Sequence, residues 1–120
     1  SVDFIALSSY NRGTVSMGAV RLIMDTRSSV TGRDVLIVED ILDTGYTLDY
    51  LLRAFQAREP ASLRTCALIS KPERHKVQVD IDYLGFEVPD EWLVGYGLDY
   101  SDRFRTLPYI GILKREVYEE

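Results

Sequence analysis

Three carboxylates lie close together in one stretch of the chain, and a short run of small and hydroxyl-bearing residues follows them at once. Glu39 and Asp40 come directly after the apolar run 35–38, Asp43 comes next, and residues 44–47 read Thr-Gly-Tyr-Thr. Between Arg33 and Arg53 there are five acidic residues and no basic one. Carboxylates this close repel one another unless a metal ion, sugar hydroxyls or nearby cations compensate them. The spacing therefore predicts a ligand site.

The run 44–47 is suited to hold an anion. Gly45 allows a tight turn, the threonine hydroxyls can donate hydrogen bonds, and the N–H groups of a helix that starts here point outward at its positive end. A site that accepts both a phosphate and either hydroxyls or Mg²⁺ fits a sugar phosphate. A plain alternative stays open, in which a hydroxyl only caps a helix after a strand. Capping requires one hydroxyl, however, and no cluster of acids.

The flanking elements would place this site at the edge of a sheet. The apolar run 35–38 predicts a strand buried on both faces of a parallel sheet, followed by an acidic turn. Apolar residues with helical spacing follow, at Leu48, Leu51, Leu52 and Phe55. Pro60 ends this helix, and 63–70 predicts the next strand. A strand–helix–strand unit implies a right-handed parallel crossover, which brings Lys71 to the same carboxyl edge as the acids.

The rest of the chain predicts smaller elements. Residues 1–7 and 20–24 indicate two antiparallel strands around a polar loop of nine or ten residues, and loops of that length are often functional or mobile. Shorter strands are expected at 82–86 and 109–113, with a solvated, charged tail over 114–120.

Composition bounds the class of protein. A chain of 120 residues with 46% hydrophobic and 28% charged residues is sufficient for one domain with a core. A net charge of −5 argues against a nucleic-acid surface, but a local nest of N–H groups can still bind phosphate. The single cysteine, Cys66, allows no internal disulfide, so we expect a reducing compartment, the cytoplasm. No apolar stretch reaches the roughly 20 residues that span a bilayer.

Residues 35–47 resemble the phosphoribosyl-pyrophosphate (PRPP) signature of type I phosphoribosyltransferases, most closely that of the hypoxanthine-guanine family, and the resemblance extends from residue 1 to about Leu113. It implies an α/β fold, a parallel sheet flanked by helices with a flexible antiparallel lid hairpin and a small C-terminal base-binding hood. The family's usual N-terminal portion has no counterpart here, so we expect that part of the fold to be missing. The implied division is one partial domain over 1–120, a catalytic loop over 8–20, a PRPP-binding segment over 35–58 and a purine-binding region over 82–113.

The resemblance assigns the PRPP-binding residues. They are Glu39, Asp40, Asp43, Thr44, Gly45, Tyr46 and Thr47. Glu39 and Asp40 would receive the ribose 2′ and 3′ hydroxyls, and residues 43–47 the 5′-phosphate. Asp43 would be the catalytic general base that takes the proton on the N7 side of the purine. Mg²⁺ would be the cofactor, bound to PRPP, with Glu39, Asp40 and Asp99 as its protein ligands.

The purine and pyrophosphate residues lie later in the chain. By resemblance, Lys71 would bind the 6-oxo group and reject adenine, Trp92 would stack on the base, and the backbone of Leu93 would read the pyrimidine-ring edge. Asp99 would lie near the base and the metal. The plain alternatives are a solvated lysine in the basic run 71–76, a tryptophan that fills a core, and an aspartate in a turn.

Three further residues would serve the pyrophosphate and the lid. Arg105 aligns with the family's pyrophosphate arginine, and a guanidinium can bind two phosphate oxygens at once. Ser9 and Tyr10 match the Ser-Tyr pair of the family's catalytic lid, which would close over PRPP and exclude water. A plain polar hairpin tip is the alternative for the lid.

These assignments imply a purine salvage transferase. It would convert hypoxanthine or guanine and PRPP to IMP or GMP and pyrophosphate, as a homo-oligomer, dimer or tetramer, with no nucleic-acid or membrane partner. A regulatory relative that binds PRPP without chemistry is one alternative, and the presence of Lys71, Trp92 and Asp99 favours the enzyme over it. A receiver domain is a weaker alternative, because Lys71 comes too early for one. A P-loop nucleotidase is excluded, since its motif is absent.

Overall fold

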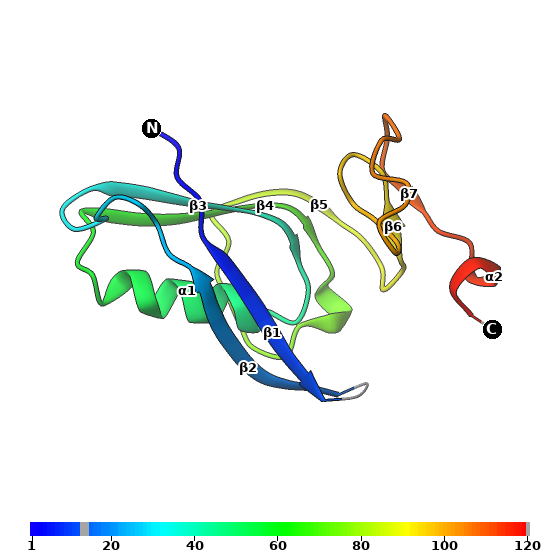
Figure 1. Ribbon diagram of the computed structural model, residues 1–120, viewed down its shortest axis with the longest axis horizontal. Coiled ribbons are helices and arrows are strands. Elements are labelled where there is room, and N and C mark those ends of the chain that lie inside the picture. The colour runs from blue at the N-terminus through cyan, green and yellow to red at the C-terminus, as the bar shows by residue number, and fades with distance from the viewer. Residues whose placement is uncertain (13–14, 120) are drawn as a thin grey trace. The chain divides into compact units, whose positions relative to one another are not determined.

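The computed structural model describes residues 1–12 and 15–119, with residues 9–12 and 15–18 described by their backbone only. The chain forms two compact units, Ser1–Val88 and Pro89–Glu120. The elements of the first unit are β1 (Ala6–Arg12), β2 (Val15–Met24), β3 (Asp34–Leu42), α1 (Tyr46–Gln56), β4 (Ser62–Ser70), the short 3-10 helix η1 (Pro72–Arg74) and β5 (Tyr83–Glu87) (Figure 1). Those of the second are β6 (Leu93–Val94), β7 (Gly111–Ile112) and α2 (Arg115–Tyr118).

A parallel three-stranded sheet organises the first unit. Its strand order is β3–β4–β5, and α1 connects the first two strands. This arrangement confirms the parallel strand–helix–strand unit expected from the sequence. The register pairs Leu42 with Ser70 at the last position of both strands. The loops that follow β3 and β4 therefore leave the sheet at the same carboxyl edge.

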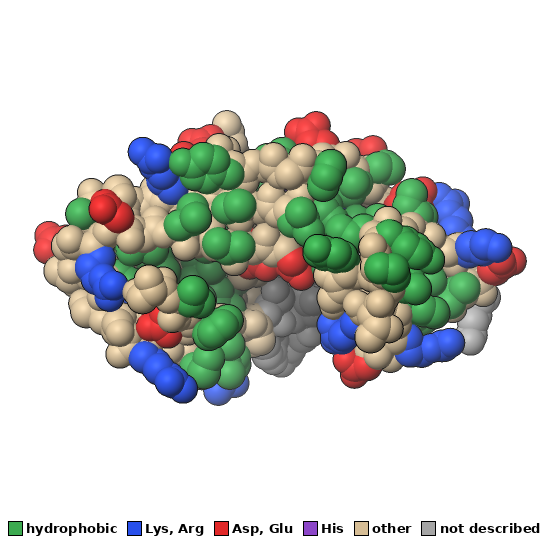
Figure 2. Space-filling model, turned by 90° about the horizontal axis from the view of Figure 1, so that it is seen from above, with side chains coloured by type: hydrophobic (Ala, Val, Ile, Leu, Met, Phe, Trp, Pro, Cys, Tyr) green, Lys and Arg blue, Asp and Glu red, His purple; other side chains and the backbone are tan. Residues whose placement is uncertain are grey.

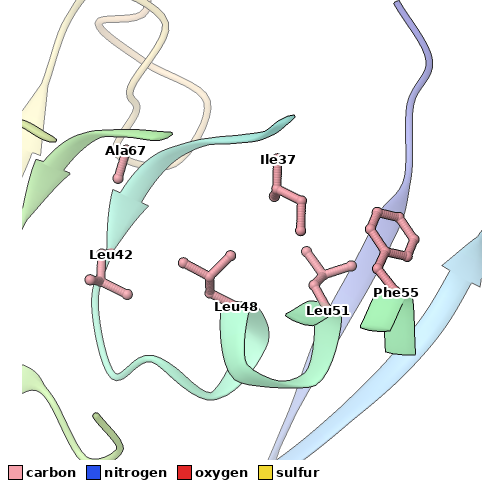
Figure 3. Close-up of a cluster of buried hydrophobic side chains, with 6 residues drawn as sticks. All are labelled: Ile37, Leu42, Leu48, Leu51, Phe55 and Ala67. Atoms are coloured by element: carbon pink, nitrogen blue, oxygen red, sulfur yellow. The ribbon is translucent and has the colours of Figure 1, made fainter. Parts of the chain in front are cut away.

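The core of this unit lies between the sheet and α1. Leu48, Leu51 and Phe55 of α1 are almost fully buried and point toward Ile37 of β3, with Leu42 and Ala67 completing the cluster (Figure 3). Partly buried side chains add to the cluster from several segments, namely Ile5, Leu7, Val35, Leu52, Leu63, Val79 and Ile81. Each large apolar side chain buried in this way contributes about 1.5–3 kcal/mol. The helical spacing in the sequence thus fixes how α1 packs.

The opposite face of β3 is open, which corrects the prediction of a strand buried on both faces. Leu36 is 52% exposed and Val38 is 72% exposed. They directly precede and follow buried Ile37, and because successive side chains of a strand point to opposite faces, both point away from α1. A view from the side away from α1 shows hydrophobic side chains on the surface here (Figure 2). Within the described residues, only one face of this sheet is covered by a helix.

The first two strands form a longer hairpin than expected. β1 and β2 pair antiparallel from Ala6 and Met24 to Arg12 and Val15, so most of the predicted loop is strand. A register shift between Tyr10 and Asn11 takes up extra residues of β2. Pairing of the backbone therefore overrides the polar composition from which a loop was predicted.

The second unit is mostly irregular. β6 and β7 are two residues each and pair antiparallel. Among the described residues of this unit, four that are not glycine have positive φ, namely Tyr96, Ser101, Asp102 and Phe104. The predicted strand over 109–113 is reduced to β7, and the predicted solvated tail contains α2. In the described part of the chain, no helix is long and apolar enough to cross a membrane.

Candidate active site

The loop between β3 and α1 presents unpaired donors at the helix start. Gly45 is the N-cap of α1, with φ of 94°, and no side chain of the described residues caps the helix. The first helical bond runs from the N–H of Asp49 to the carbonyl oxygen of Gly45, at 2.9 Å. The N–H groups before it, and the nearby threonine hydroxyls, are thus available to a ligand. The plain alternative, in which a hydroxyl of this loop caps the helix, is therefore wrong.

A second segment supports this loop from behind. The N–H of Lys76 donates to the carbonyl oxygen of Thr44, at 2.8 Å, and the N–H of Val77 donates to the same oxygen, at 3.4 Å. A Cβ at position 45 would lie 3.0 Å from the side chain and from the backbone oxygen of Val77. Glycine is thus required at position 45 both by its positive φ and by the close approach of Val77.

Glu39 and Asp40 lie within β3, so the predicted acidic turn is wrong for these two residues. The strand continues to Leu42 because its pairing with β4 continues through Leu42 and Ser70. The N–H of Asp40 donates to a carboxylate oxygen of Glu39, at 3.3 Å. Burial, together with the neighbouring Asp40 carboxylate, raises the pKa of Glu39 to about 7. Such a carboxylate pair favours a partner that supplies hydroxyl donors or positive charge.

Asp43 and Lys71 lie at the shared carboxyl edge of the sheet. Asp43 follows the last residue of β3, and its side chain is 47% exposed. The N–H of Lys71 donates to the carbonyl oxygen of Leu42, at 2.9 Å, which fixes the backbone of Lys71 beside the loop that carries Asp43. Lys71 is partly buried, so it is not a fully solvated member of the basic run.

Two further residues of the basic run 71–76 make specific contacts here. The guanidinium of Arg74, in η1, forms an ion pair with Oδ1 of Asp43. The Nε2 atom of His75 lies 3.1 Å from the hydroxyl oxygen of Ser70, which is buried. The basic run gave no periodic or spacing signal that could separate Arg74 from its neighbours, because the contact with Asp43 arises only when η1 folds back over the β3–α1 loop.

In the second unit, Trp92 belongs to an aromatic cluster. Its ring centroid lies 5.3 Å from that of Tyr100, edge to face, and 5.8 Å from that of Tyr118 of α2. Its indole N–H donates to the carbonyl oxygen of Asp99, at 3.2 Å. Trp92 remains 45% exposed, so it is not simply a core residue, whereas the adjacent Leu93 is buried. The sequence prediction missed Tyr100 and Tyr118 as supports of this ring.

Asp99 and Arg105 are brought together in the same unit. A guanidinium nitrogen of Arg105 lies 3.3 Å from a carboxylate oxygen of Asp99. Arg105 also donates to the carbonyl oxygen of Gly97 and to Asp102, each at 2.8 Å. The hydrogen bond to Asp102 raises the pKa of Arg105 above its ordinary value. The predicted pyrophosphate arginine is thus held in place by neighbouring oxygens of its own loop.

The remaining predicted residues are not tested by these contacts. The side chains of Ser9 and Tyr10 lie outside the described residues. Within residues 1–12 and 15–119, no three His, Cys, Asp or Glu side chains form a group that could hold a metal ion. Glu39 and Asp40 offer a neighbouring pair, which suits Mg²⁺ that takes its other ligands from phosphates and water.

Known proteins similar to this chain share its sequence and its fold. The family described as phosphoribosyl transferase domain matches residues 1–101. The chain is 52% identical over 118 residues to a hypoxanthine-guanine phosphoribosyltransferase of Bacillus subtilis, and 52% identical over 119 residues to the bifunctional protein TilS/HprT of Listeria monocytogenes. The crystal structure of a hypoxanthine phosphoribosyltransferase from Staphylococcus aureus superposes with a TM-score of 0.94 at 49% identity.

The match covers nearly all of this chain but only part of each relative. It covers 98% of the chain and 66% of the Bacillus protein, 99% and 18% for the Listeria protein, and 100% and 65% for the Staphylococcus structure. The predicted α/β fold of type I phosphoribosyltransferases is therefore confirmed for this part. The donor-rich loop after β3, the parallel sheet and the sequence match all agree, and the chain belongs to the phosphoribosyl transferase domain family.

Proposed function

We propose that this chain carries the PRPP and purine sites of a 6-oxopurine phosphoribosyltransferase, which forms IMP or GMP and pyrophosphate from PRPP and hypoxanthine or guanine. The observation that carries the proposal is the β3–α1 loop, where available N–H groups and hydroxyls stand beside Glu39, Asp40 and Asp43. A phosphate would bind the donors and the ribose hydroxyls would bind the acids. The names of the relatives support the same reaction.

The PRPP half of the site follows from the loop. The 5′-phosphate would accept hydrogen bonds from the N–H groups at the start of α1 and from Thr44, Tyr46 and Thr47. The ribose 2′ and 3′ hydroxyls would donate to Glu39 and Asp40. The pKa of Glu39 is raised to about 7 in the free chain. Hydrogen bonds from the ribose hydroxyls would stabilise the charged form of Glu39 and so lower its pKa.

The reaction itself requires one proton acceptor. N9 of the purine forms a bond to C1′ of the ribose, the bond from C1′ to the pyrophosphate oxygen breaks, and the proton on the N7 side of the base passes to Asp43. Asp43 suits this role because it lies at the sheet edge with its carboxylate about half exposed. A general base of this kind contributes about 10²–10⁴-fold to the rate.

The purine half of the proposal assigns roles to Lys71, Trp92, Leu93 and Asp99. The Lys71 ammonium would donate to the 6-oxo group and disfavour the 6-amino group of adenine, which is itself a donor. The partly exposed ring of Trp92 would stack on the base, and the backbone of Leu93 would contact its pyrimidine-ring edge. Asp99 would lie near the base.

The pyrophosphate half uses a cation and the lid. Arg105 would bind the pyrophosphate oxygens, with Ser9 and Tyr10 covering them. Mg²⁺, the proposed cofactor, supplies positive charge to the pyrophosphate when bound, and Glu39 and Asp40, with Asp99, would hold it together with substrate oxygens. We further propose a cytoplasmic location and a homo-oligomer, dimer or tetramer. A regulatory protein that binds PRPP without chemistry is the second candidate.

One assay separates these functions. Pyrophosphate release is measured from PRPP and Mg²⁺ with hypoxanthine, guanine, xanthine and adenine in turn. We expect turnover with 6-oxopurines and little with adenine. Binding of PRPP without turnover on any base would favour the regulatory alternative. Adenine as the best substrate would contradict the role of Lys71.

A further inference from the structure

The β4–β5 connection makes more contacts with the β3–α1 loop than its solvated, basic sequence suggests. The structure describes at least four backbone or side-chain contacts between the two segments. They are Lys71 to Leu42, Arg74 to Asp43, and both Lys76 and Val77 to Thr44. Every residue from the end of β3 to Thr44 is therefore held by this connection. Of these contacts, only the one from Arg74 reaches a side chain with a proposed chemical role.

The geometry of that contact suits a carboxylate that must be held and still react. The Nε atom of Arg74 approaches Oδ1 of Asp43, so the contact leaves Oδ2 for another partner. Arg74 is the last residue of η1. The N–H groups of Arg74 and His75 donate to the carbonyl oxygens of Lys71 and Pro72, respectively. His75 in turn lies against the buried Ser70 hydroxyl. The guanidinium is thus carried by a turn fixed to the end of β4.

We propose that Arg74 is a positioning residue that orients the Asp43 carboxylate, so that one oxygen is held by the guanidinium and the other faces the proton on the purine. The inference rests on the proposed function, since it takes Asp43 as the general base. The side chains of Arg74 and Asp43 are 42% and 47% exposed, so the ion pair contributes little to the stability of the fold. Its main effect is to orient the Asp43 carboxylate.

This role predicts a specific kinetic signature. A general base that is displaced by about 1 Å can lose about 10²-fold in rate. Arg74→Ala should therefore lower kcat by about 10- to 100-fold, with the KM for PRPP changed less than about 2-fold. Arg74→Lys, which keeps the charge but loses the planar fork, should recover part of kcat. Arg53→Gln removes another exposed arginine that pairs with an aspartate, on α1, and serves as the matched control with unchanged kcat.

The test is a double-mutant cycle in the intact protein, with PRPP varied up to saturation at a saturating concentration of hypoxanthine and Mg²⁺ in excess. Asp43→Asn, Arg74→Ala and the double variant are compared for kcat with hypoxanthine, and circular dichroism and thermal unfolding check the fold of each. If Arg74 acts through Asp43, Arg74→Ala lowers kcat in the parent and has no further effect in Asp43→Asn. A raised KM for PRPP with unchanged kcat, or an equal loss in both backgrounds, would overturn the inference, because Arg74 would then act on substrate directly or on the fold.

The same cycle separates this inference from the proposed function. If Asp43→Asn turns over as fast as the parent, the general-base assignment fails, and the positioning role fails with it. If Asp43→Asn is slow and Arg74→Ala is as fast as the parent, Asp43 keeps its role and only the inference about Arg74 is wrong. If Arg74→Ala does not fold, Arg74→Lys and Arg74→Gln supply the comparison, with partial recovery expected for lysine and none for glutamine.

Discussion

The loop after β3 and the loop after β6 both contain glycines with φ above 90°, yet they present polar groups in different ways. Around Gly45, a regular strand and a regular helix hold the loop, and the N–H groups at the start of α1 have no partner within the described chain. Around Gly95 and Gly97, short bridges hold the loop, and its charged groups already bond to each other, as Arg105 does with Asp99 and Asp102.

The difference indicates two ways to prepare a binding site. The first loop offers backbone donors whose direction is set by the helix axis, so a phosphate that binds them displaces none of their contacts within the described residues. The second loop is built from side chains that are held by ion pairs and ring contacts, so a ligand must compete with, or add to, existing partners. We therefore expect substitutions in the first loop to affect chemistry, and those in the second to affect folding and the binding of the base and the pyrophosphate.

The largest effect is expected at Asp43. Asp43→Asn keeps the shape of the side chain but removes the proton acceptor, so kcat with hypoxanthine and guanine should fall by about 10²–10⁴-fold. Steady-state pyrophosphate release measures it. Asp49→Asn is the matched control, because Asp49 lies in the first turn of the same helix and pairs with Arg53. Unchanged turnover in Asp43→Asn would remove the general-base assignment.

The next effect tests the second loop through its glycines. A Cβ at Gly95 would lie 2.0 Å from the carbonyl oxygen of Tyr109, whereas one at Gly97 would meet nothing within 4 Å, and both have φ of 96°. Gly95→Ala should destabilise the second unit by about 3 kcal/mol, from strain and overpacking together. Gly97→Ala should cost about 1–2 kcal/mol, from its backbone conformation alone.

The single tryptophan makes this comparison measurable. Trp92 lies in the second unit, so its fluorescence in urea reports unfolding there, while far-ultraviolet circular dichroism is dominated by α1 of the first unit. We expect Gly95→Ala to shift the fluorescence transition more than the circular dichroism transition. Equal shifts for Gly95→Ala and Gly97→Ala would contradict the steric argument.

A smaller effect concerns Glu39 and pH. Its folded pKa of about 7 lies above the ordinary value of 4.5, so the folded chain binds this proton more tightly than the unfolded chain. That contribution to stability is complete below pH 4.5 and is lost as the pH rises to about 7. Glu39→Gln should therefore be more stable than the parent by about 1–3 kcal/mol at pH 8, with the difference vanishing near pH 4.5.

Urea unfolding of the ligand-free chain at several pH values measures this effect. Glu73→Gln is the control with the same chemical change, because Glu73 is exposed in η1. If Glu39→Gln raised the free energy of unfolding by the same amount at pH 4.5 and at pH 8, packing would cause the change in stability, and not the charge of the carboxylate.

The sequence predicted the parts of this molecule that repeat regularly. The helical spacing of Leu48, Leu51 and Phe55 identified the buried face of α1, and the strand–helix–strand order identified the parallel pairing. The donor-rich loop could be predicted because its residues are contiguous. The extent of β3 could not be predicted, because Glu39, Ile41 and Leu42 pair with β4 and so keep this acidic segment in the strand, and local composition does not encode that pairing.

Contacts between segments that are far apart in the chain could not be predicted from the sequence either. Arg74 meets Asp43 only because the β4–β5 connection folds over the earlier loop, 31 residues back in the chain. Tyr118 meets Trp92 because the end of the chain forms α2, although its charged composition suggested a solvated tail. For Leu36 and Val38 the prediction was wrong in the opposite direction, because the apolar run predicts burial on both faces whereas both side chains are exposed.

The smallest effect expected in this series is at Trp92, which directly precedes β6 and donates its indole N–H to the carbonyl oxygen of Asp99 in the second loop. Its substitution tests whether this loop, with the ring that it supports, serves the base. Trp92→Leu removes the ring but keeps an apolar side chain, and a lost aromatic stack costs about 0.5–1.5 kcal/mol. The KM for hypoxanthine should rise up to about 10-fold, while the KM for PRPP should stay the same. Trp92→Phe should recover most of the loss, and Tyr109→Leu, which removes another exposed ring of this unit, should leave both KM values unchanged. If Trp92→Leu raised the KM for PRPP and for hypoxanthine equally, the ring would act by holding Tyr100 and Tyr118 in place, and the contrast between a loop for chemistry and a loop for the base would fail.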